Sequence, residues 1–124
     1  MARVLVVDDI AELRSLMLEI LSIPGHEVFT AANGEEAIWK FREVHPDLIL
    51  LDISMPGMSG YDVLRALREC PGGDQAKVVM MTALNDAKAI QQALELGARD
   101  YFVKGSMEID HLLDRVEQHV QAQA

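Results

Sequence analysis

The sequence predicts an α/β domain in which five strands alternate with five helices around one parallel sheet. Three observations support this fold class: short apolar runs of strand length recur along the chain, apolar residues at helical spacing separate them, and proline or glycine follows most helical segments. Strict alternation implies right-handed crossovers, which place helices on both faces of the sheet. With 124 residues, 50% of them hydrophobic, the chain can bury one core, so we expect residues 1–124 to form a single domain.

The first strand is expected at Arg3–Val7, directly before Asp8 and Asp9. The segment that follows has apolar residues at i, i+3, i+4, i+7 and i+8, which is the spacing of one helical stripe. These residues are Leu13, Leu16, Met17, Ile20 and Leu21. Pro24 ends this helix. Asp9 could cap the helix, with Glu12 three residues on, and this is an alternative to a functional role for its carboxylate.

A second strand, His26–Ala31, is less apolar, which fits an edge position in the sheet. Asn33 is placed to cap the next helix, and Glu36 completes a capping-box pattern. The buried face of this helix is expected to contain Ala37, Ile38 and Phe41. Pro46 ends the helix, and Trp39 lies off its apolar stripe, so we expect an exposed tryptophan that hints at a partner surface.

The third strand, Leu48–Leu51, is an almost unbroken apolar run, which a central strand covered on both faces requires. Asp52 follows it directly. A loop that contains Pro56 then leads to a third helix, which ends at Pro71. Its buried face is expected to contain Val63, Leu64 and Leu67.

The fourth strand is expected at Lys77–Met81, and the helix after it stops at Gly97. That helix is expected to bury Ile90, Ala93 and Leu94. A fifth strand starts at Arg99 and contains the run Tyr101–Val103, and Ser106 can cap the last helix. The apolar stripe of the last helix comprises Ile109, Leu112, Leu113, Val116 and Val120.

Composition excludes several classes of function. The net charge is −9 and no block of contiguous lysine and arginine exists, which argues against direct binding of nucleic acid. No apolar run is long enough to span a membrane and the N-terminus lacks the features of a signal peptide, so we expect a cytoplasmic protein without membrane insertion. Cys70 is the only cysteine, which excludes an intramolecular disulfide and is expected to be a small, semi-buried side chain.

The four histidines show no pair at zinc-ligand spacing, and the chain has no Walker phosphate loop and no G-x-G-x-x-G motif. We therefore expect the histidines to be surface or edge residues. They are His26, His45, His111 and His119.

Four predicted strands end in groups that can bind phosphate or a divalent metal. These groups are Asp8 with Asp9, Asp52, Thr82 and Lys104. In a parallel sheet they converge on one edge, where open α/β sheets bind their ligands. Three carboxylates suit Mg²⁺, a hard cation that takes few protein ligands, better than zinc, which prefers nitrogen and sulfur. Taken singly, Thr82 could be a helix-entry residue and Lys104 a surface lysine, but four separate segments contribute to the convergence.

The motifs at these positions are Val-Asp-Asp at 7–9, Leu-Asp-Ile-Ser-Met-Pro-Gly-Met-Ser-Gly at 51–60, Met-Thr-Ala at 81–83 and Val-Lys at 103–104. In this order they resemble the receiver domain of two-component response regulators, in particular single-domain chemotaxis-type receivers. The resemblance covers the whole chain. It implies a flavodoxin-like fold with strand order 2-1-3-4-5, in which the first and third strands are neighbours at the switch point.

The resemblance implies that Asp52 is the phosphoacceptor, which takes a phosphoryl group from the phosphohistidine of a histidine kinase or a phosphotransfer protein. Asp8, Asp9, Asp52 and the backbone carbonyl of Ser54 would hold Mg²⁺. The protein would catalyse only its own phosphorylation and dephosphorylation, so no enzyme with a separate substrate is expected.

Thr82 and Lys104 would contact the new phosphoryl oxygens, and Tyr101 would be the switch aromatic, whose inward rotation follows the movement of the threonine. The family's usual output surface is the fourth helix, fifth strand and fifth helix, here about residues 85–118. The signal would pass to a downstream effector protein, from a monomer or a phosphorylation-dependent dimer. Because no output domain follows the fifth helix, a stand-alone receiver is favoured over a domain cut from a longer regulator.

The chain departs from the family pattern at Gly105, where a proline is usual. Glycine allows the turn without fixing it, so we expect a more mobile loop after Lys104. Ser54 and Leu84 occupy the positions that tune hydrolysis of the aspartyl phosphate in the family. Leucine offers no group to orient a water molecule, which predicts a comparatively long-lived phosphorylated state.

Three other interpretations compete with this one. A phosphohydrolase of the haloacid dehalogenase type needs a second aspartate two residues after the first, where this chain has Ser54. A flavin-binding module needs a phosphate loop after the first strand, where Asp8 and Asp9 would repel phosphate. A degenerate receiver that serves only as a docking module is less favoured because every reactive position is filled.

Overall fold

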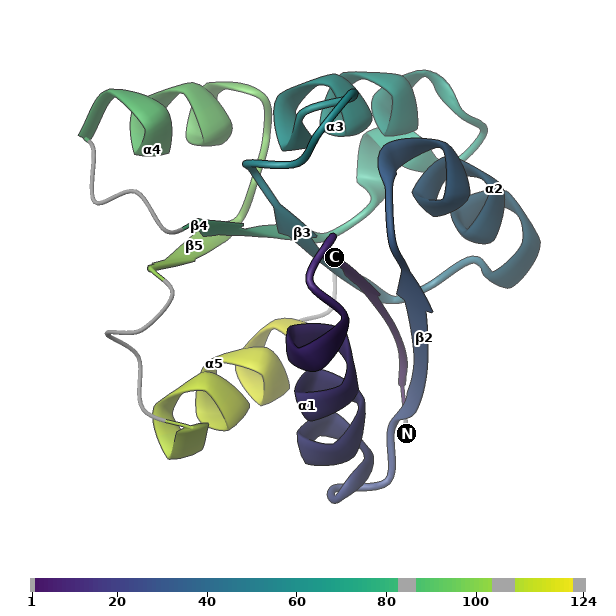
Figure 1. Cartoon of the computed structure of the whole chain (residues 1–124), viewed down its shortest axis with the longest axis vertical. Helices are drawn as coiled ribbons and strands as arrows, with labels where there is room; N and C mark the ends of the chain where they lie inside the picture. The colour runs from purple at the N-terminus through teal and green to yellow at the C-terminus, as the bar shows by residue number, and fades with distance from the viewer. Residues whose placement is uncertain (1, 83–86, 104–108, 122–124) are drawn as a thin grey trace.

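Five parallel strands form one sheet with helices on both faces (Figure 1). The computed structural model describes residues 2–82, 87–103 and 109–121. The strands are β1 (Arg3–Val7), β2 (Glu27–Ala31), β3 (Leu48–Asp52), β4 (Val78–Thr82) and β5 (Asp100–Val103). Their order across the sheet is β2-β1-β3-β4-β5, so the predicted fold class and strand order are confirmed.

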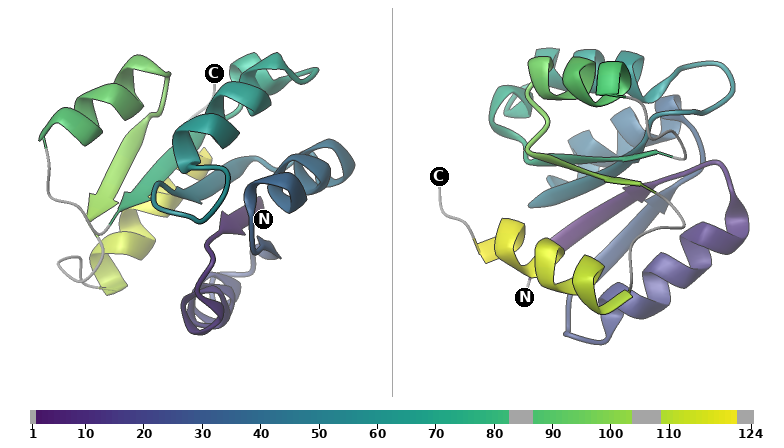
Figure 2. Two further views of the ribbon diagram at one scale, coloured as in Figure 1. Left: turned by 45° about the horizontal axis from the view of Figure 1, so that its top comes forward. Right: turned by 90° about the vertical axis from the view of Figure 1, so that its left-hand side faces the viewer.

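The described part of the chain contains every predicted helix and one short helix that the sequence did not predict. The helices are α1 (Ala11–Ser22), α2 (Gly34–Val44), α3 (Gly60–Glu69), the 3-10 helix η1 (Gly73–Gln75), α4 (Ala87–Glu95) and α5 (Ile109–Gln121). One face of the sheet is covered by α2, α3 and α4, and the other by α1 and α5 (Figure 1, Figure 2). None of the helices within the described ranges is long and apolar enough to cross a membrane.

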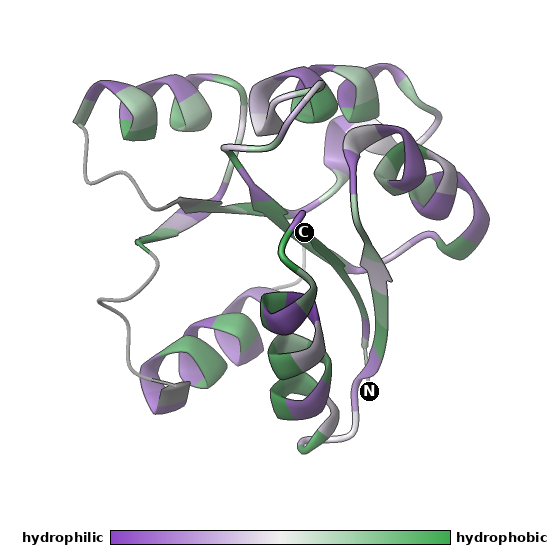
Figure 3. Cartoon of the chain, viewed as in Figure 1, coloured by the Kyte–Doolittle hydropathy of each residue, from purple (hydrophilic) through white to green (hydrophobic). Residues whose placement is uncertain are grey.

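The sheet separates two apolar layers, because successive side chains of a strand point to opposite faces. Leu5 and Ile49 pack in the layer under α2, α3 and α4, whereas Val4 and Leu48 pack in the layer over α1 and α5. All residues of β3 are buried, which confirms its predicted central position. Figure 3 shows the apolar character of β3 and the mixed character of the helices around it. Each fully buried leucine or isoleucine stabilises the fold by about 2 kcal/mol.

Side chains cap two of the helices on this sheet. Asn33 accepts a hydrogen bond from the backbone N–H of Glu36 at 2.9 Å, which confirms the predicted cap of α2. At the start of α3, Ser59 and Asp62 form a reciprocal capping box that the sequence analysis did not single out. This box fixes the first turn of α3 directly after the loop that follows Asp52.

The alternative role of Asp9 as a helix cap is wrong. The residue that precedes α1 is Ile10, whose side chain cannot cap, and its N–H donates to Asp8 Oδ1 at 2.9 Å. Asp9 is exposed and stands one residue before this position. Its carboxylate is therefore available for a role other than capping.

Two predicted buried residues are instead exposed. Leu16 of α1 is 44% exposed and Leu94 of α4 is 46% exposed. Both lie on the flank of the helical stripe, where none of the helices and strands described above covers them, while Met17 and Ala93 at the centre of the two stripes are buried. The apolar stripe predicted which face of each helix points to the sheet, but not how far around the helix the buried surface extends. Trp39 is 59% exposed, as predicted.

The expectation that all four histidines are surface or edge residues is wrong for His26, which is buried. Its Nδ1 accepts a hydrogen bond from the N–H of Ala2 at 3.2 Å, and its Nε2 contacts the carboxylate of Glu117 on α5. These partners satisfy both ring nitrogens, so burial of this polar ring is tolerated. Cys70 is buried, close to the predicted semi-buried position.

Candidate functional site

Three carboxylates meet at the carboxyl edge of the sheet, as the strand topology predicted. Asp8 follows β1 and Asp52 ends β3, and these strands are neighbours in which Val7 pairs with Leu51. One carboxylate oxygen from each of Asp8, Asp9 and Asp52 lies within 4.8 Å of the others. Asp8 is fully buried and Asp52 is only 2% exposed, whereas Asp9 faces solvent. Two carboxylates of the cluster are therefore buried, and the third leaves the cluster open to solvent on one side.

The backbone helps to stabilise the two buried carboxylates. Asp8 Oδ1 accepts the N–H of Ile10 at 2.9 Å, and Asp52 Oδ1 accepts the N–H of Ser54 at 3.3 Å. The Arg14 guanidinium donates to the backbone carbonyl of Asp8 at 2.7 Å, which places a positive charge near this edge. Neighbouring carboxylates still repel one another when ionised, because few solvent molecules screen them.

The donor set fits a magnesium ion. Three carboxylate oxygens of this spacing are hard ligands, and the open side of the cluster leaves room for water or a phosphate oxygen. The described residues place no histidine or cysteine in this cluster, so zinc is a poor fit.

The loop after β3 brings Ser54 next to the cluster. Ser54 is exposed, and its N–H points to Asp52, as the 3.3 Å contact shows. The loop closes where the N–H of Gly60 donates to the carbonyl of Ile53 at 2.8 Å. The predicted metal ligand is the backbone carbonyl of Ser54, and that role stays a prediction.

The remaining predicted site residues come from the neighbouring strands. Thr82 is the last residue of β4, and because Asp52 pairs with Met81, Thr82 ends its strand at the same edge of the sheet as the carboxylates. Tyr101 lies in β5, is half-buried, and packs against the apolar layer under α4. Lys104 lies outside the described residues, as do Leu84, Gly105 and Ser106.

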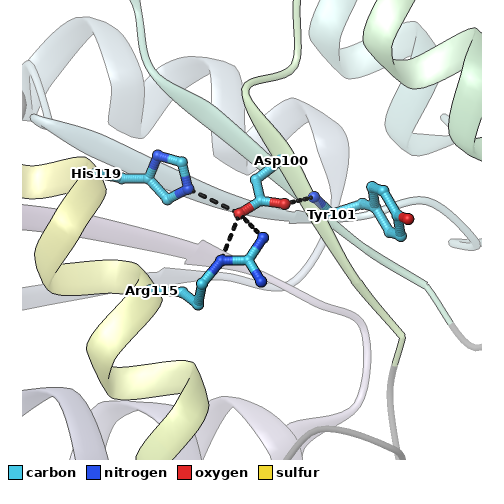
Figure 4. Close-up of polar contacts among 4 residues, drawn as sticks. All are labelled: Asp100, Tyr101, Arg115 and His119. Carbon is cyan, nitrogen blue, oxygen red and sulfur yellow. Dashed lines mark hydrogen bonds and ion pairs between the residues drawn. The ribbon is translucent and has the colours of Figure 1, made fainter.

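A second polar cluster ties β5 to α5, and the sequence analysis missed it. Asp100 Oδ2 accepts hydrogen bonds from Arg115 Nε and from His119 Nε2, each at 2.9 Å, and also contacts Arg115 Nη2 (Figure 4). Its Oδ1 accepts the N–H of Tyr101 at 2.9 Å. Burial opposes ionisation of Asp100, but the hydrogen bonds from His119 and Arg115 outweigh it and hold the pKa of this carboxyl below its usual value.

One signal could have revealed the cluster. Arg115 and His119 are four residues apart, so they lie on the same side of a helix, next to the apolar stripe that faces the sheet. Arg115 also lies over the ring of Phe102, 5.6 Å from its centroid. Two hydrogen-bond donors on the inner side of α5, Arg115 and His119, call for an acceptor on the sheet, and Asp100 is that acceptor.

The comparison with known families agrees with the fold and the site. The profile of the response regulator receiver domain matches residues 4–117. The chain therefore belongs to the response regulator receiver domain family. Receiver domains are signalling modules of two-component systems rather than enzymes in the usual sense.

Two relatives match this chain over very different shares of their own length. The chain is 43% identical over 102 residues to the probable transcriptional regulator ycf27 of Porphyridium aerugineum, with 82% of this chain and 41% of that protein covered. It thus spans about two fifths of the length of the ycf27 relatives it matches. It is 35% identical over 118 residues to sporulation initiation phosphotransferase F of Bacillus subtilis, with 95% of this chain and 93% of that protein covered.

Solved structures confirm the fold. The chemotaxis protein CheY4 of Vibrio cholerae superposes with a TM-score of 0.89 at 31% identity, covering 95% of this chain and 98% of that one. The response regulator protein TrrA of Thermotoga maritima, solved in complex with Mg²⁺ and BeF, superposes with a TM-score of 0.83 at 39% identity, covering 96% and 99%.

Proposed function

We propose that this receiver domain, formed by residues 1–124, accepts a phosphoryl group on Asp52 from the phosphohistidine of a histidine kinase or a phosphotransfer protein. The observation that carries the proposal is the carboxylate cluster: oxygens of Asp8 and Asp9, which follow β1, and of Asp52, which ends the fully buried strand β3, lie within 4.8 Å of one another. The relative named as a phosphotransferase and the solved neighbour with Mg²⁺ and BeF support this function.

The transfer requires Asp52 to act as the nucleophile. One of its carboxylate oxygens attacks phosphorus in line with the donor, the phosphorus–nitrogen bond breaks, and its electron pair stays on the donor imidazole. The product is an acyl phosphate on Asp52 and a free histidine on the donor. Such a transfer needs positioning and charge neutralisation more than covalent assistance.

Asp8, Asp9, Asp52 and the backbone carbonyl of Ser54 would hold Mg²⁺. When bound, the ion neutralises charge on the carboxylates and on the phosphoryl oxygens. Asp8 is oriented by its bond to the N–H of Ile10, so its position does not depend on the ion. Asp9 lies on the exposed side and can adjust to the ligand.

We assign the groups around the phosphoryl from the place of Thr82 at the end of β4 and, for Lys104, from the resemblance of the sequence motifs to those of the family. Thr82 would donate a hydrogen bond to a phosphoryl oxygen, and Lys104 would pair with another. Tyr101 would turn inward after Thr82 moves, and the signal would leave through the face of α4, β5 and α5. The receiver would act only on its own Asp52, and an effector, either attached or separate, would read this face.

Intact mass after incubation with acetyl phosphate tests the proposal. The wild type is expected to gain one phosphoryl group in the presence of Mg²⁺ and none with a chelator, and Asp52→Ala is expected to gain none. Asp114→Ala, which removes an exposed carboxylate on α5, is the matched control and is expected to behave as the wild type. A gain that persists in Asp52→Ala, or that needs no Mg²⁺, would refute the assignment.

A further inference from the structure

Side chains of α3 hold both ends of α4. The hydroxyl of Tyr61 donates to the carbonyl of Ala89, in the first turn of α4, at 2.9 Å. Seven residues along α3, the guanidinium of Arg68 donates to the carbonyl of Gly97 at 2.8 Å and to that of Leu96 at 3.4 Å. These carbonyls lie just beyond the last turn of α4. One face of α3 therefore makes hydrogen bonds at both ends of α4.

Apolar packing fixes α4 less firmly than it fixes α1. The fully buried residues of α4 are Ala89 and Ala93, while Ile90 is half-buried and Leu94 is 46% exposed. By contrast, α1 buries three large side chains, Met17, Ile20 and Leu21. Because stabilisation scales with the apolar area removed from water, two alanines fix a helix much less firmly than three large residues do. The hydrogen bonds from α3 therefore matter more for α4 than for α1.

The Arg68 end of α4 is firmly attached. Besides the two carbonyls after α4, Arg68 Nη1 donates to the carbonyls of Gly73 at 2.8 Å and Ala76 at 2.7 Å. Burial lowers the pKa of this guanidinium, which still remains a cation, so these are charge-assisted bonds in a partly dry site. Gly97 is in the left-handed region at φ +91°, and a Cβ atom there would stand 3.1 Å from Arg68 Nη2.

The bond at the Tyr61 end of α4 is weaker than the bonds of Arg68. A neutral hydroxyl–carbonyl bond contributes less than the charge-assisted bonds of Arg68. Beside it lies a cavity of about 390 Å³, lined on one side by Ser54, Met55 and Ser59 and on the other by Ala89 and Gln92. The first turn of α4 thus has room to shift without compressing the core.

The same cavity connects α4 to the carboxylate cluster. Its wall includes Ser54, whose N–H donates to Asp52 Oδ1. A phosphoryl group on Asp52 changes the charge and the acceptor capacity of that carboxylate, so it alters the bond that holds Ser54. Phosphorylation of Asp52 is therefore expected to shift Ser54, and with it the wall of the cavity that lies across from Ala89.

We propose that Tyr61 is a positioning residue whose hydroxyl holds the first turn of α4 in its unphosphorylated position, while Arg68 holds the opposite end as a pivot. The inference rests on the proposed phosphorylation of Asp52 and identifies the contact that this step releases. Loss of the Tyr61–Ala89 bond favours the packing of α4 found in the phosphorylated state, because the unphosphorylated packing loses one stabilising contact.

Tyr61→Phe tests the inference, since it removes the hydroxyl and keeps the ring. Ser22→Ala is the control for the loss of a hydroxyl–carbonyl bond away from α4, because Ser22 Oγ donates to the carbonyl of Leu18 within α1 at 2.6 Å. The first measurement is the affinity for beryllofluoride with Mg²⁺. Tyr61→Phe is expected to bind between about twofold and tenfold tighter than the wild type, the range that one neutral hydrogen bond allows, and Ser22→Ala is expected to bind as the wild type does.

The second measurement is amide hydrogen exchange of α4 in the unphosphorylated protein, which does not depend on the function of Asp52. Exchange within Ala87–Glu95 is expected to be between about twofold and tenfold faster in Tyr61→Phe and unchanged in Ser22→Ala. Unchanged exchange in Tyr61→Phe overturns the positioning role, and unchanged or weaker beryllofluoride affinity overturns its link to activation. If the wild type itself does not bind beryllofluoride, the function proposed for Asp52 fails, while the exchange result still decides the role of Tyr61.

Discussion

The backbone of Asp52 occupies the space that a side chain on Gly60 would need. A Cβ atom added to Gly60 would lie 2.3 Å from the carbonyl oxygen of Asp52 and 2.7 Å from Cα of Ile53. The start of α3 therefore packs directly on the backbone that carries the carboxylate of Asp52. Only glycine allows this approach, because both clashing atoms belong to the main chain.

Gly60→Ala is expected to destabilise the fold by about 3 kcal/mol, since the backbone of β3 or α3 must move to admit the methyl group. Gly57→Ala is the control: Gly57 has φ +79° but no atom within 4 Å of an added Cβ, so only the backbone strain of about 1 kcal/mol applies. Urea denaturation of both variants measures the difference. Equal losses would mean that the close approach of Gly60 to Asp52 is of no energetic consequence.

Asp9→Asn is expected to raise the stability of the metal-free protein slightly, because it removes one of three mutually repelling carboxylates. The same substitution should weaken Mg²⁺ binding at least about tenfold, since the loss of a direct ligand should cost no less than the loss of an outer partner. Calorimetric titration with Mg²⁺ and thermal unfolding without it measure the two effects. Glu12→Gln, which removes an exposed acid in the first turn of α1, should change neither much.

Stability is expected to depend on Asp100 in acid. The pKa of this carboxyl in the folded protein is lower than its ordinary value of 3.8, so the ionised form stabilises the folded state. That contribution is fully present above about pH 4 and is lost as the pH falls through the lowered pKa. The wild type should therefore lose more stability than Asp100→Asn between about pH 5 and pH 3 in urea titrations. Asp114→Asn, an exposed acid on α5, should follow the wild type.

Arg68→Lys is expected to cost about 3 kcal/mol, although the charge is retained. The guanidinium reaches carbonyls in the segments after α3 and after α4, and the three donors of an ammonium cannot match this geometry. Arg65→Lys is the control on the same helix, because within the described part of the chain the contact of Arg65 is an exposed one with Asp62 at 3.3 Å. Thermal unfolding distinguishes the two, and a cost for Arg68→Lys no larger than that for Arg65→Lys would contradict the anchoring role.

The phosphorylated state is expected to be long-lived, because Leu84 offers no polar group that could orient an attacking water molecule. Leu84→Glu should shorten the lifetime, which can be followed by the loss of the phosphoryl mass after the donor is removed. Leu84→Met is the apolar control and should leave the lifetime unchanged. A wild-type lifetime of seconds that Leu84→Glu does not alter would rule out this explanation.

Regular patterns in the sequence were sufficient to predict the sheet and the carboxylate cluster. Parallel strands bring their ends to one edge, so adjacency of β1 and β3 leads directly to the meeting of Asp8 and Asp52. The exposure of Leu16 could not be predicted in this way, because an apolar stripe does not say how far a neighbouring element extends over it.

The contacts that the sequence did not reveal join residues far apart in the chain. The bond from Tyr61 to Ala89 spans 28 residues, and the contact of His26 with Glu117 spans 91. Such pairs depend on how helices pack across the sheet, which local spacing does not specify. Pro71 marked the end of α3, but η1 after it depends on the close approach of Gly73 to the backbone of Leu67.

The full burial of β3 has a consequence for how such a domain can diversify. The strand has neighbouring strands on both sides and apolar layers on both faces. Substitutions in it are therefore expected to destabilise the fold. The helices that would meet partners, in contrast, carry exposed residues that can change freely, Trp39 and Leu94 among them. The outer surfaces of such a domain can therefore diverge in sequence, while the buried strand that carries Asp52 is retained.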